Sequence, residues 1–214
     1  MKKDFLPGSK RFCTLNKGFT LIELVISLAI GMVLLMAMYS VFEIQRKTLQ
    51  VQEQVAELQQ AVRAGMDMMI RDIRMAGYDP AGTAGAGIVA VDSGGSRIYI
   101  TMDLNGDGDL SDSASTAEDT GEHVVYDLYN NKLGRAVGHS DINLSQSIGH
   151  QPVVENIETL SFTYDTASQA VTISLTGRTA QPDPKYTDPV YKDHYRRYTL
   201  QTSLIARNLL ATAP

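Results

Sequence analysis

Residues 17–42 read KGFTLIELVISLAIGMVLLMAMYSVF, and this stretch decides how the chain is organised. The 19 residues from Leu24 to Phe42 carry no charge. As an α-helix with a rise of about 1.5 Å per residue they would be roughly 28 Å long, close to the thickness of the hydrocarbon core of a bilayer. The stretch therefore predicts a helix that crosses a membrane once.

The segment before this helix is basic, because residues 1–18 hold five Lys or Arg and a single acid, Asp4. A basic flank predicts a cytoplasmic N-terminus and an external C-terminus. A secretory signal peptide would have a shorter apolar core followed by a small-residue cleavage site, and this sequence has neither. Cys13 precedes the apolar run, which disfavours a lipoprotein signal. A plain single-pass anchor stays open on hydropathy alone.

Glu23 places a carboxylate inside the apolar segment. An acid in lipid costs a few kcal/mol, about 2.5–3.5 for Asp at a helix centre, so such residues are usually paired and functional. Residues 17–24, KGFTLIEL, resemble the class III signal of type IV prepilins and of type II secretion pseudopilins. The resemblance implies that a prepilin peptidase cleaves after Gly18 on the cytoplasmic side and N-methylates Phe19.

Cleavage would free an α-amino group at Phe19, near the apolar boundary. In a helical assembly, Glu23 of one subunit would neutralise the Phe19 amine of a neighbour. Two buried charges offset each other only in the correct register, so the pair would act as a register key. The alternative, in which Glu23 merely extends toward the membrane surface, stays open.

The helix is predicted to continue beyond the membrane segment, because no proline occurs between Pro7 and Pro80. Apolar residues recur at spacings of three, four and seven, which is typical of one helix face. They are Ile44, Val51, Val55, Leu58, Val62, Met66, Met69 and Ile73. We predict one helix from about Thr20 to Ala76. Its stripe would pack against the protein's own head, with coiled-coil dimerisation as the alternative.

Beyond Tyr78 the composition shifts toward Gly, Ser, Thr, Asp and Asn, and short alternating runs predict an antiparallel sheet. These runs are Ile88–Val91, Arg97–Met102, His123–Tyr129, Val153–Tyr164, Ala170–Thr176 and Tyr195–Ala206. The expected fold class is α+β, and the resemblance implies the type IV pilin fold. We expect a cleaved leader at 1–18, a long helix at 19–76 with a transmembrane first half, and a β-rich head at 77–214.

The head carries a second resemblance, at three places. Residues 74–78, 156–164 and 206–208 are similar to minor pilins of the PilW kind and to the J-type minor pseudopilin of type II secretion. Residues 79–150 lie almost entirely outside this likeness. What it implies is a protein that assembles with others rather than one that turns over a substrate.

One loop of the head predicts a calcium site. Oxygen-bearing side chains at its first, third and fifth positions, followed by Gly108, match the front half of an EF-hand loop. The candidate Ca²⁺ ligands are Asp103, Asn105, Asp107, Asp109 and Asp112. Asp109 would offer its backbone carbonyl. The twelfth position is Ala114 instead of glutamate, so another acid must complete the site, and a solvated acidic turn is the alternative.

Composition and motifs argue against several other classes. The chain has 24 acidic and 19 basic residues and a formal net charge of −5, so nucleic acid is not an expected partner. The four histidines form no HExxH pattern, and there is no GxSxG, Walker A loop or GxGxxG. We therefore expect no enzyme. Tyrosines and basic residues alternate within 185–198, which suggests a binding surface or, more often, an exposed strand edge.

These observations together indicate a minor pilin that is assembled into the tip or priming complex of a type IV pilus. Its partners would be the prepilin peptidase and methylase, other major and minor pilins through the N-terminal helix, and the membrane before assembly. It would lie in the inner membrane with a periplasmic or extracellular head. A type II secretion minor pseudopilin is the first alternative, and an uncleaved membrane-anchored binding or sensor protein is the second.

Overall fold

The computed structural model describes most of the chain, namely residues 18–92, 94–110, 121–138 and 151–210. The predicted leader, residues 1–18, therefore lies outside the described residues except for Gly18. The chain divides into two compact units, Met1–Leu49 and Gln50–Pro214.

The long helix α1 spans Leu21–Met75, one residue shorter at each end than the predicted Thr20–Ala76. It ends because Gly77 has a φ of +77°, a left-handed conformation that glycine adopts without steric cost. The amide of Gly77 leaves the helix and donates to the carbonyl of Thr101 at 3.0 Å. The helix thus stops where the backbone begins to hydrogen-bond to the end of strand β2 (Arg97–Thr101).

The first sheet is an antiparallel meander of five strands in chain order. Its strands are β1 (Ile88–Val91), β2 (Arg97–Thr101), β3 (His123–Tyr129), β4 (Lys132–Gly138) and β5 (Gln151–Glu155). Asn130 and Asn131 join β3 to β4 in a two-residue turn, with φ values of 48° and 58°. Positive φ at both positions is typical of the type I′ hairpin. Strand β4 was not predicted, because Gly134 and Gly138 interrupt its alternation.

The second sheet holds β6 (Ile157–Asp165), β7 (Ala170–Arg178) and β8 (Arg197–Ile205), also antiparallel and in chain order. A single strand over Val153–Tyr164 was predicted, and this is wrong. Asn156 takes a φ of 60° between β5 and β6, so the chain leaves one sheet there and enters the other. The α+β class with a long N-terminal helix and antiparallel sheets is confirmed, with two sheets in place of one.

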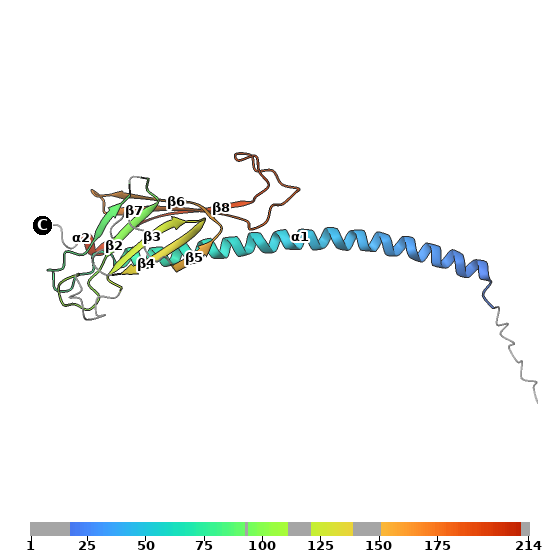
Figure 1. Cartoon of the computed structure of the whole chain (residues 1–214), viewed down its shortest axis with the longest axis horizontal. Helices are drawn as coiled ribbons and strands as arrows, with labels where there is room; N and C mark the ends of the chain where they lie inside the picture. The colour runs from blue at the N-terminus through green and yellow to red at the C-terminus, as the bar shows by residue number, and fades with distance from the viewer. Residues whose placement is uncertain (1–17, 93, 111–120, 139–150, 211–214) are drawn as a thin grey trace, which may run out of the picture. The chain divides into compact units, whose positions relative to one another are not determined.

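The core of the second unit forms between the end of α1 and both sheets, as Figure 1 shows for the strands around the turquoise part of the helix. The buried residues of α1 repeat at helical spacing. They are Leu58, Val62, Gly65, Met66, Met69 and Ile73. They share one cluster with side chains such as Val124 of β3 and Ile173 of β7. The predicted stripe therefore packs on the chain's own sheets along this part of the helix.

Two glycines allow this helix face to approach the strands. A Cβ added at Gly65 would lie 2.8 Å from Cγ2 of Val154 and 3.0 Å from Cδ2 of Leu133. A Cβ added at Gly177 of β7 would lie 2.6 Å from Cδ1 of Leu58. Contacts this short require a neighbour to move, so both positions lack a side chain for reasons of packing.

We expect Gly65→Val to lower the free energy of unfolding by about 1–3 kcal/mol, because overpacking displaces the β4 and β5 side chains. For a protein of this size that is a fall in Tm of roughly 2–10 °C, measured by circular dichroism on the full-length protein in detergent. Ala64→Val is the matched control, since Ala64 is exposed and the change costs only helix propensity, about 0.5 kcal/mol. Equal losses in the two variants would contradict the close approach at Gly65.

Candidate functional site

The start of α1 is closed by a reciprocal pair of hydrogen bonds between Thr20 and Glu23. The Glu23 amide donates to Oγ1 of Thr20 at 3.3 Å, and the Thr20 amide donates to Oε2 of Glu23 at 3.0 Å. The Thr20 hydroxyl also donates to Oε2, at 3.0 Å. This is a capping box, which satisfies amides that a helix start leaves unpaired. Glu23 thus stabilises its own helix, a role that the sequence analysis missed although Thr-x-x-Glu is its signature.

The predicted cleavage point lies just before this cap. Phe19 is 86% exposed and, with Gly18, precedes the first residue of the helix. A Cβ at Gly18 would meet no atom within 4 Å. The peptide bond between Gly18 and Phe19 is therefore outside regular structure and free of packing, as a bond must be to enter a protease as extended chain.

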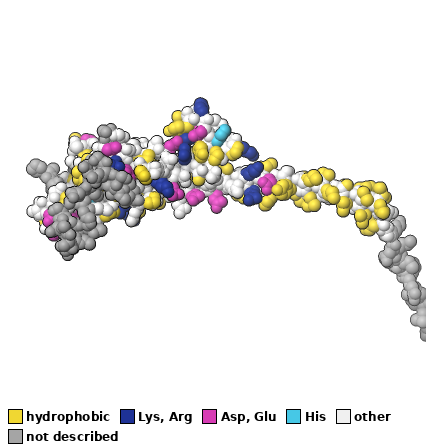
Figure 2. All heavy atoms as spheres, viewed as in Figure 1, with side chains coloured by type: hydrophobic (Ala, Val, Ile, Leu, Met, Phe, Trp, Pro, Cys, Tyr) yellow, Lys and Arg dark blue, Asp and Glu magenta, His cyan; other side chains and the backbone are white. Residues whose placement is uncertain are grey.

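Every large hydrophobic side chain from Leu21 to Phe42 is exposed. Figure 2 shows these side chains as a continuous yellow surface on this part of α1. By length and composition, α1 is the helix among the described residues that could cross a membrane, and none of its apolar window is buried. A surface of this kind needs an apolar environment, either lipid or other helices.

The predicted calcium loop lies between β2 and β3. Asp103 is fully buried, and its carboxylate accepts the amides of Gly106 at 2.6 Å and Gly108 at 3.1 Å. Asn105 and Asp107 contact each other, with Nδ2 of Asn105 donating to Oδ2 of Asp107 at 3.1 Å. The Asp109 amide donates to Oδ1 of Asp107 at 3.0 Å.

Two further observations concern that prediction. Asp112 lies outside the described residues. Within the described part of the chain, no three His, Cys, Asp or Glu side chains already converge on a point that could hold a metal ion. The structure does bring one unpredicted acid to the loop. Glu122, immediately before β3, is fully buried and accepts the Leu104 amide at 2.8 Å.

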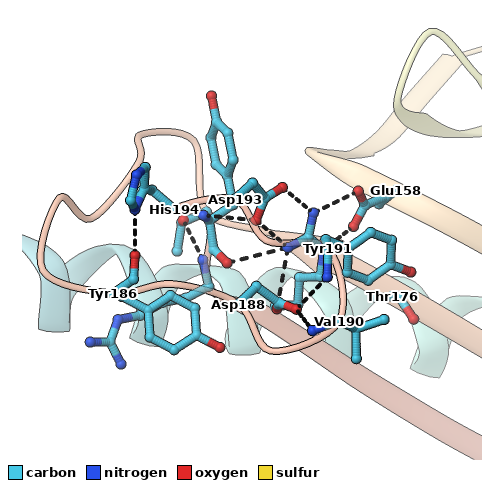
Figure 3. Close-up of polar contacts among 12 residues, drawn as sticks. Glu158, Thr176, Tyr186, Asp188, Val190, Tyr191, Asp193 and His194 are labelled. Atoms are coloured by element: carbon cyan, nitrogen blue, oxygen red, sulfur yellow. Dashed lines mark hydrogen bonds and ion pairs between the residues drawn. The ribbon is translucent and has the colours of Figure 1, made fainter.

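A second charged site holds the loop that leads from β7 to β8. Arg197, the first residue of β8, has a side chain only 8% exposed. Its guanidinium donates to Glu158 of β6 and to both oxygens of Asp193, at 2.8 and 2.6 Å. It also lies 3.3 Å from a carboxylate oxygen of Asp188 and 3.9 Å from the ring centre of Tyr191. Figure 3 shows these acids gathered from strand and loop around one guanidinium.

Two neighbouring arginines are also engaged by acids or aromatic rings of the chain, so the arginines of the predicted basic and aromatic cluster have partners within the fold. Arg196 donates to Asp183 at 2.8 and 3.0 Å and lies 4.6 Å from the ring centre of Tyr186. Arg178 lies 4.9 Å from the ring centre of Tyr195. These contacts within the chain give the loop a defined shape without regular structure.

The ion pairs shift the acidities of this loop. Hydrogen bonds from Arg197 lower the pKa of Asp193 to about 2. The pKa of Asp188 is lowered chiefly by the amide of Tyr191, and that of Asp183 by Arg196. The pKa of Arg197 is raised, mainly by its hydrogen bonds to Asp193. A carboxyl group with a depressed folded-state pKa adds stability above its unfolded pKa near 4, and that contribution disappears as pH falls through the folded pKa.

We expect Arg197→Met to lower the free energy of unfolding at pH 7 by about 2–3 kcal/mol, because it leaves several acids without their cation. The difference in Tm from wild type should narrow as the pH falls from about 5 to 2, as Asp193 and Asp188 become protonated. Arg196→Met is the control, since Arg196 is 42% exposed and, among the described residues, forms an ion pair with one acid, Asp183. Losses that are equal in both variants, or that do not change with pH, would refute this assignment.

Comparisons with known proteins address the chain in two parts. The prokaryotic N-terminal methylation motif matches residues 14–39, and a family described as prepilin peptidase-dependent protein B matches residues 51–201. A search of curated proteins found no significant match. Among solved structures, a type IV-like pilin from Thermus thermophilus is similar, with a TM-score of 0.46 and 10% identity over 71% of this chain and 98% of that chain.

The N-terminal motif and the family agree with each other, and they confirm the resemblance to type IV prepilins. The family match extends from the second half of α1 through most of β8 and so covers more than half of the chain. The chain therefore belongs to the family described as prepilin peptidase-dependent protein B, and it is a type IV pilin-like protein with an N-methylation motif.

Proposed function

We propose that this protein is a minor pilin that is processed after Gly18, N-methylated at Phe19 and assembled into the tip or priming complex of a type IV pilus. The observation that carries the proposal is the exposed apolar surface of α1 from Leu21 to Phe42, which begins beside a single acid, Glu23. Its family and its methylation motif support the proposal. The function is one of assembly, and we propose no catalysis.

The same surface serves two successive environments in this proposal. Before assembly it lies in the inner membrane, where lipid covers the apolar side chains and the head faces the periplasm. During assembly it leaves the lipid and packs against the α1 helices of major and minor pilins. Both environments are apolar, so moving from lipid to the assembly hardly changes the burial of Leu21–Phe42. More specific contacts must therefore favour the assembled state over the membrane.

The charge on Glu23 supplies such a contact. The cap holds its carboxylate against the amide and hydroxyl of Thr20, the residue after Phe19, whose amine cleavage would free. In the membrane, Glu23 stabilises the start of its own helix. In the assembly it would also meet the Phe19 amine of a neighbouring subunit, so that each of two costly charges neutralises the other.

The processing step is tested by mass spectrometry of the full-length protein extracted from membranes of its host. We expect a mature chain that begins at Phe19 and carries one additional methyl group. Gly18→Val should leave the precursor uncleaved, because a branched side chain obstructs the bond that the peptidase must bind. Gly31→Ala is the control, since a Cβ there meets no atom within 4 Å, and it should be processed normally. A wild-type chain that keeps Met1 and has no methylation would refute processing and favour an anchored binding or sensor protein.

The role of Glu23 is tested by two substitutions that separate the charge from the cap. Glu23→Gln keeps a side chain that can form the capping box but removes the charge, whereas Glu23→Ala removes both. If charge pairing selects the subunit, both variants should be processed and both should fall at least tenfold in incorporation into sheared pili, measured by immunoblot. Normal incorporation of Glu23→Gln would show that the cap, and not the charge, is what Glu23 contributes. If the Glu23 variants leave pili normal but abolish protein export, the subunit would instead belong to type II secretion.

A further inference from the structure

The loop from β2 to β3 begins and ends with an acid. The last ladder pair of the two strands joins Thr101 to His123. One residue further, the Met102 amide donates to the carbonyl of Glu122 at 2.9 Å, so the two strands remain paired up to the start of the loop. Asp103 follows on one side and Glu122 stands on the other. The topology thus places these two carboxylates together at the base of the loop.

Both carboxylates are fully buried, with exposed fractions of 0% for Asp103 and 0% for Glu122. Neither forms an ion pair with a Lys, Arg or His in the described part of the chain. Acids are almost never this buried unless they are paired with a cation or bind a metal, because removing a charge from water is costly. Among the described residues, therefore, no cation balances the charge of these two acids.

Glu122 also has an oxygen that no group satisfies. Its Oε1 accepts the amides of Leu104 at 2.8 Å and Asn105 at 3.2 Å, which holds the carboxyl group against the loop. Its Oε2 is buried and has no hydrogen-bond partner among the described residues. Native proteins rarely leave a buried carboxylate oxygen unsatisfied, so this atom indicates a ligand that binds at the loop.

The loop provides further oxygen ligands for such a partner. Asp103, Asn105 and Asp107 alternate along the chain, and Gly106 and Gly108 have φ values of +79° and +87° that turn the backbone back on itself. Alternate carboxylate and amide oxygens at a glycine turn form the first half of a calcium loop. An EF-hand completes such a loop with a bidentate glutamate, and a glutamate brought from the far side of the loop can serve the same purpose.

We propose that this loop binds Ca²⁺, with Glu122 as the acid that completes the site in place of the residue at the twelfth position. The other ligands are Asp103, Asn105, Asp107 and the backbone carbonyl of Asp109. The buried acids then acquire a countercharge of two, and Oε2 of Glu122 acquires its partner. Because Asp107 is exposed, it turns inward when the cation binds, which accounts for the lack of a converged group of acids among the described residues.

The donor set favours calcium over other metals. All of these ligands are oxygens, which hard cations prefer, and Ca²⁺ accepts the irregular geometry that Mg²⁺ does not. In the described part of the chain the histidine beside the loop is His123, and it is already engaged at both ring nitrogens. Its Nδ1 shares a hydrogen bond with the Tyr99 hydroxyl, and its Nε2 lies 2.6 Å from the Leu110 carbonyl oxygen. Zinc, which binds imidazole and thiolate, would therefore find no free ring nitrogen on His123.

The test is a titration of the full-length protein in detergent with CaCl₂, after removal of bound metal with a chelator. Binding to the folded state alone raises Tm. With the affinity typical of extracellular calcium modules, about 10 mM Ca²⁺ should raise Tm by roughly 3–10 °C, and the same concentration of Mg²⁺ should have less than half the effect. The variants are Glu122→Gln and Asp107→Asn. Glu155→Gln is the control, because Glu155 is an exposed acid at the end of β5.

We expect both loop variants to lose the calcium-dependent rise in Tm, and the control to keep it. Without calcium, Glu122→Gln should be at least as stable as wild type, because it removes an uncompensated buried charge. If Glu122 had only a structural role, Glu122→Gln would instead lower the stability of the protein both with and without calcium. If Glu122→Gln does not fold, Asp107→Asn decides the test, because Asp107 is exposed. No rise in the wild type, or a full rise in either loop variant, overturns the proposal.

Discussion

The head depends on the burial of one face of α1. Met69 of the helix, Val124 of β3 and Ile173 of β7 belong to a single buried cluster, so the helix face provides the apolar surface that both sheets share. Each large side chain on that face contributes about 1.5–3 kcal/mol when it is fully buried, which offsets the conformational entropy lost by ordering the strands. Gly65 and Gly177 make the contact possible, because a Cβ at either position would collide with the opposite element. The helix face covers strands on both sides of the chain bend at Asn156, which separates β5 from β6.

Sequence patterns predicted the parts of this fold in which one period dominates. The spacing of Leu58, Val62, Met66, Met69 and Ile73 identified the buried face of α1, because only one side of a helix can pack on a sheet. Strand β4 was missed because it is held by its pairing with β3 through the Asn130–Asn131 turn. Its own sequence, interrupted by glycines, gives no strand pattern. The break at Asn156 was missed for a related reason: a left-handed residue changes the sheet to which a strand belongs without interrupting its alternation. Pairing and curvature are tertiary properties, and periodicity does not report them.

The candidate sites divide in the same way. Glu23 could be found from the sequence because a charged residue in an apolar run is easily recognised. Its cap with Thr20 also has a recognisable spacing. The loop beginning at Asp103 could be found because alternate oxygens followed by glycine are local. Glu122 could not, since its relation to the loop exists only after β2 and β3 have paired. Arg197 was assigned to a basic cluster on composition, whereas Glu158 reaches it from β6, and that neighbour is invisible until the second sheet is formed.

The chain has more acids than bases, so the source of the positive charge that balances them matters at three places. Around Arg197 the chain supplies its own cation, and the depressed pKa of Asp193 shows that the acids there are stabilised as carboxylates. At Glu23 the described chain offers hydrogen bonds from Thr20 but no cation, which suits the proposed pairing with an amine on another subunit. At Asp103 and Glu122 the described residues offer amides but leave one Glu122 oxygen unsatisfied, which suits the proposed cation from solution. The three acidic sites therefore differ in where their countercharge comes from and in when it becomes available. An acid that must be stable from the moment of folding carries its cation in the chain, whereas an acid that waits for assembly or export can receive its partner later, and its stability then depends on that event.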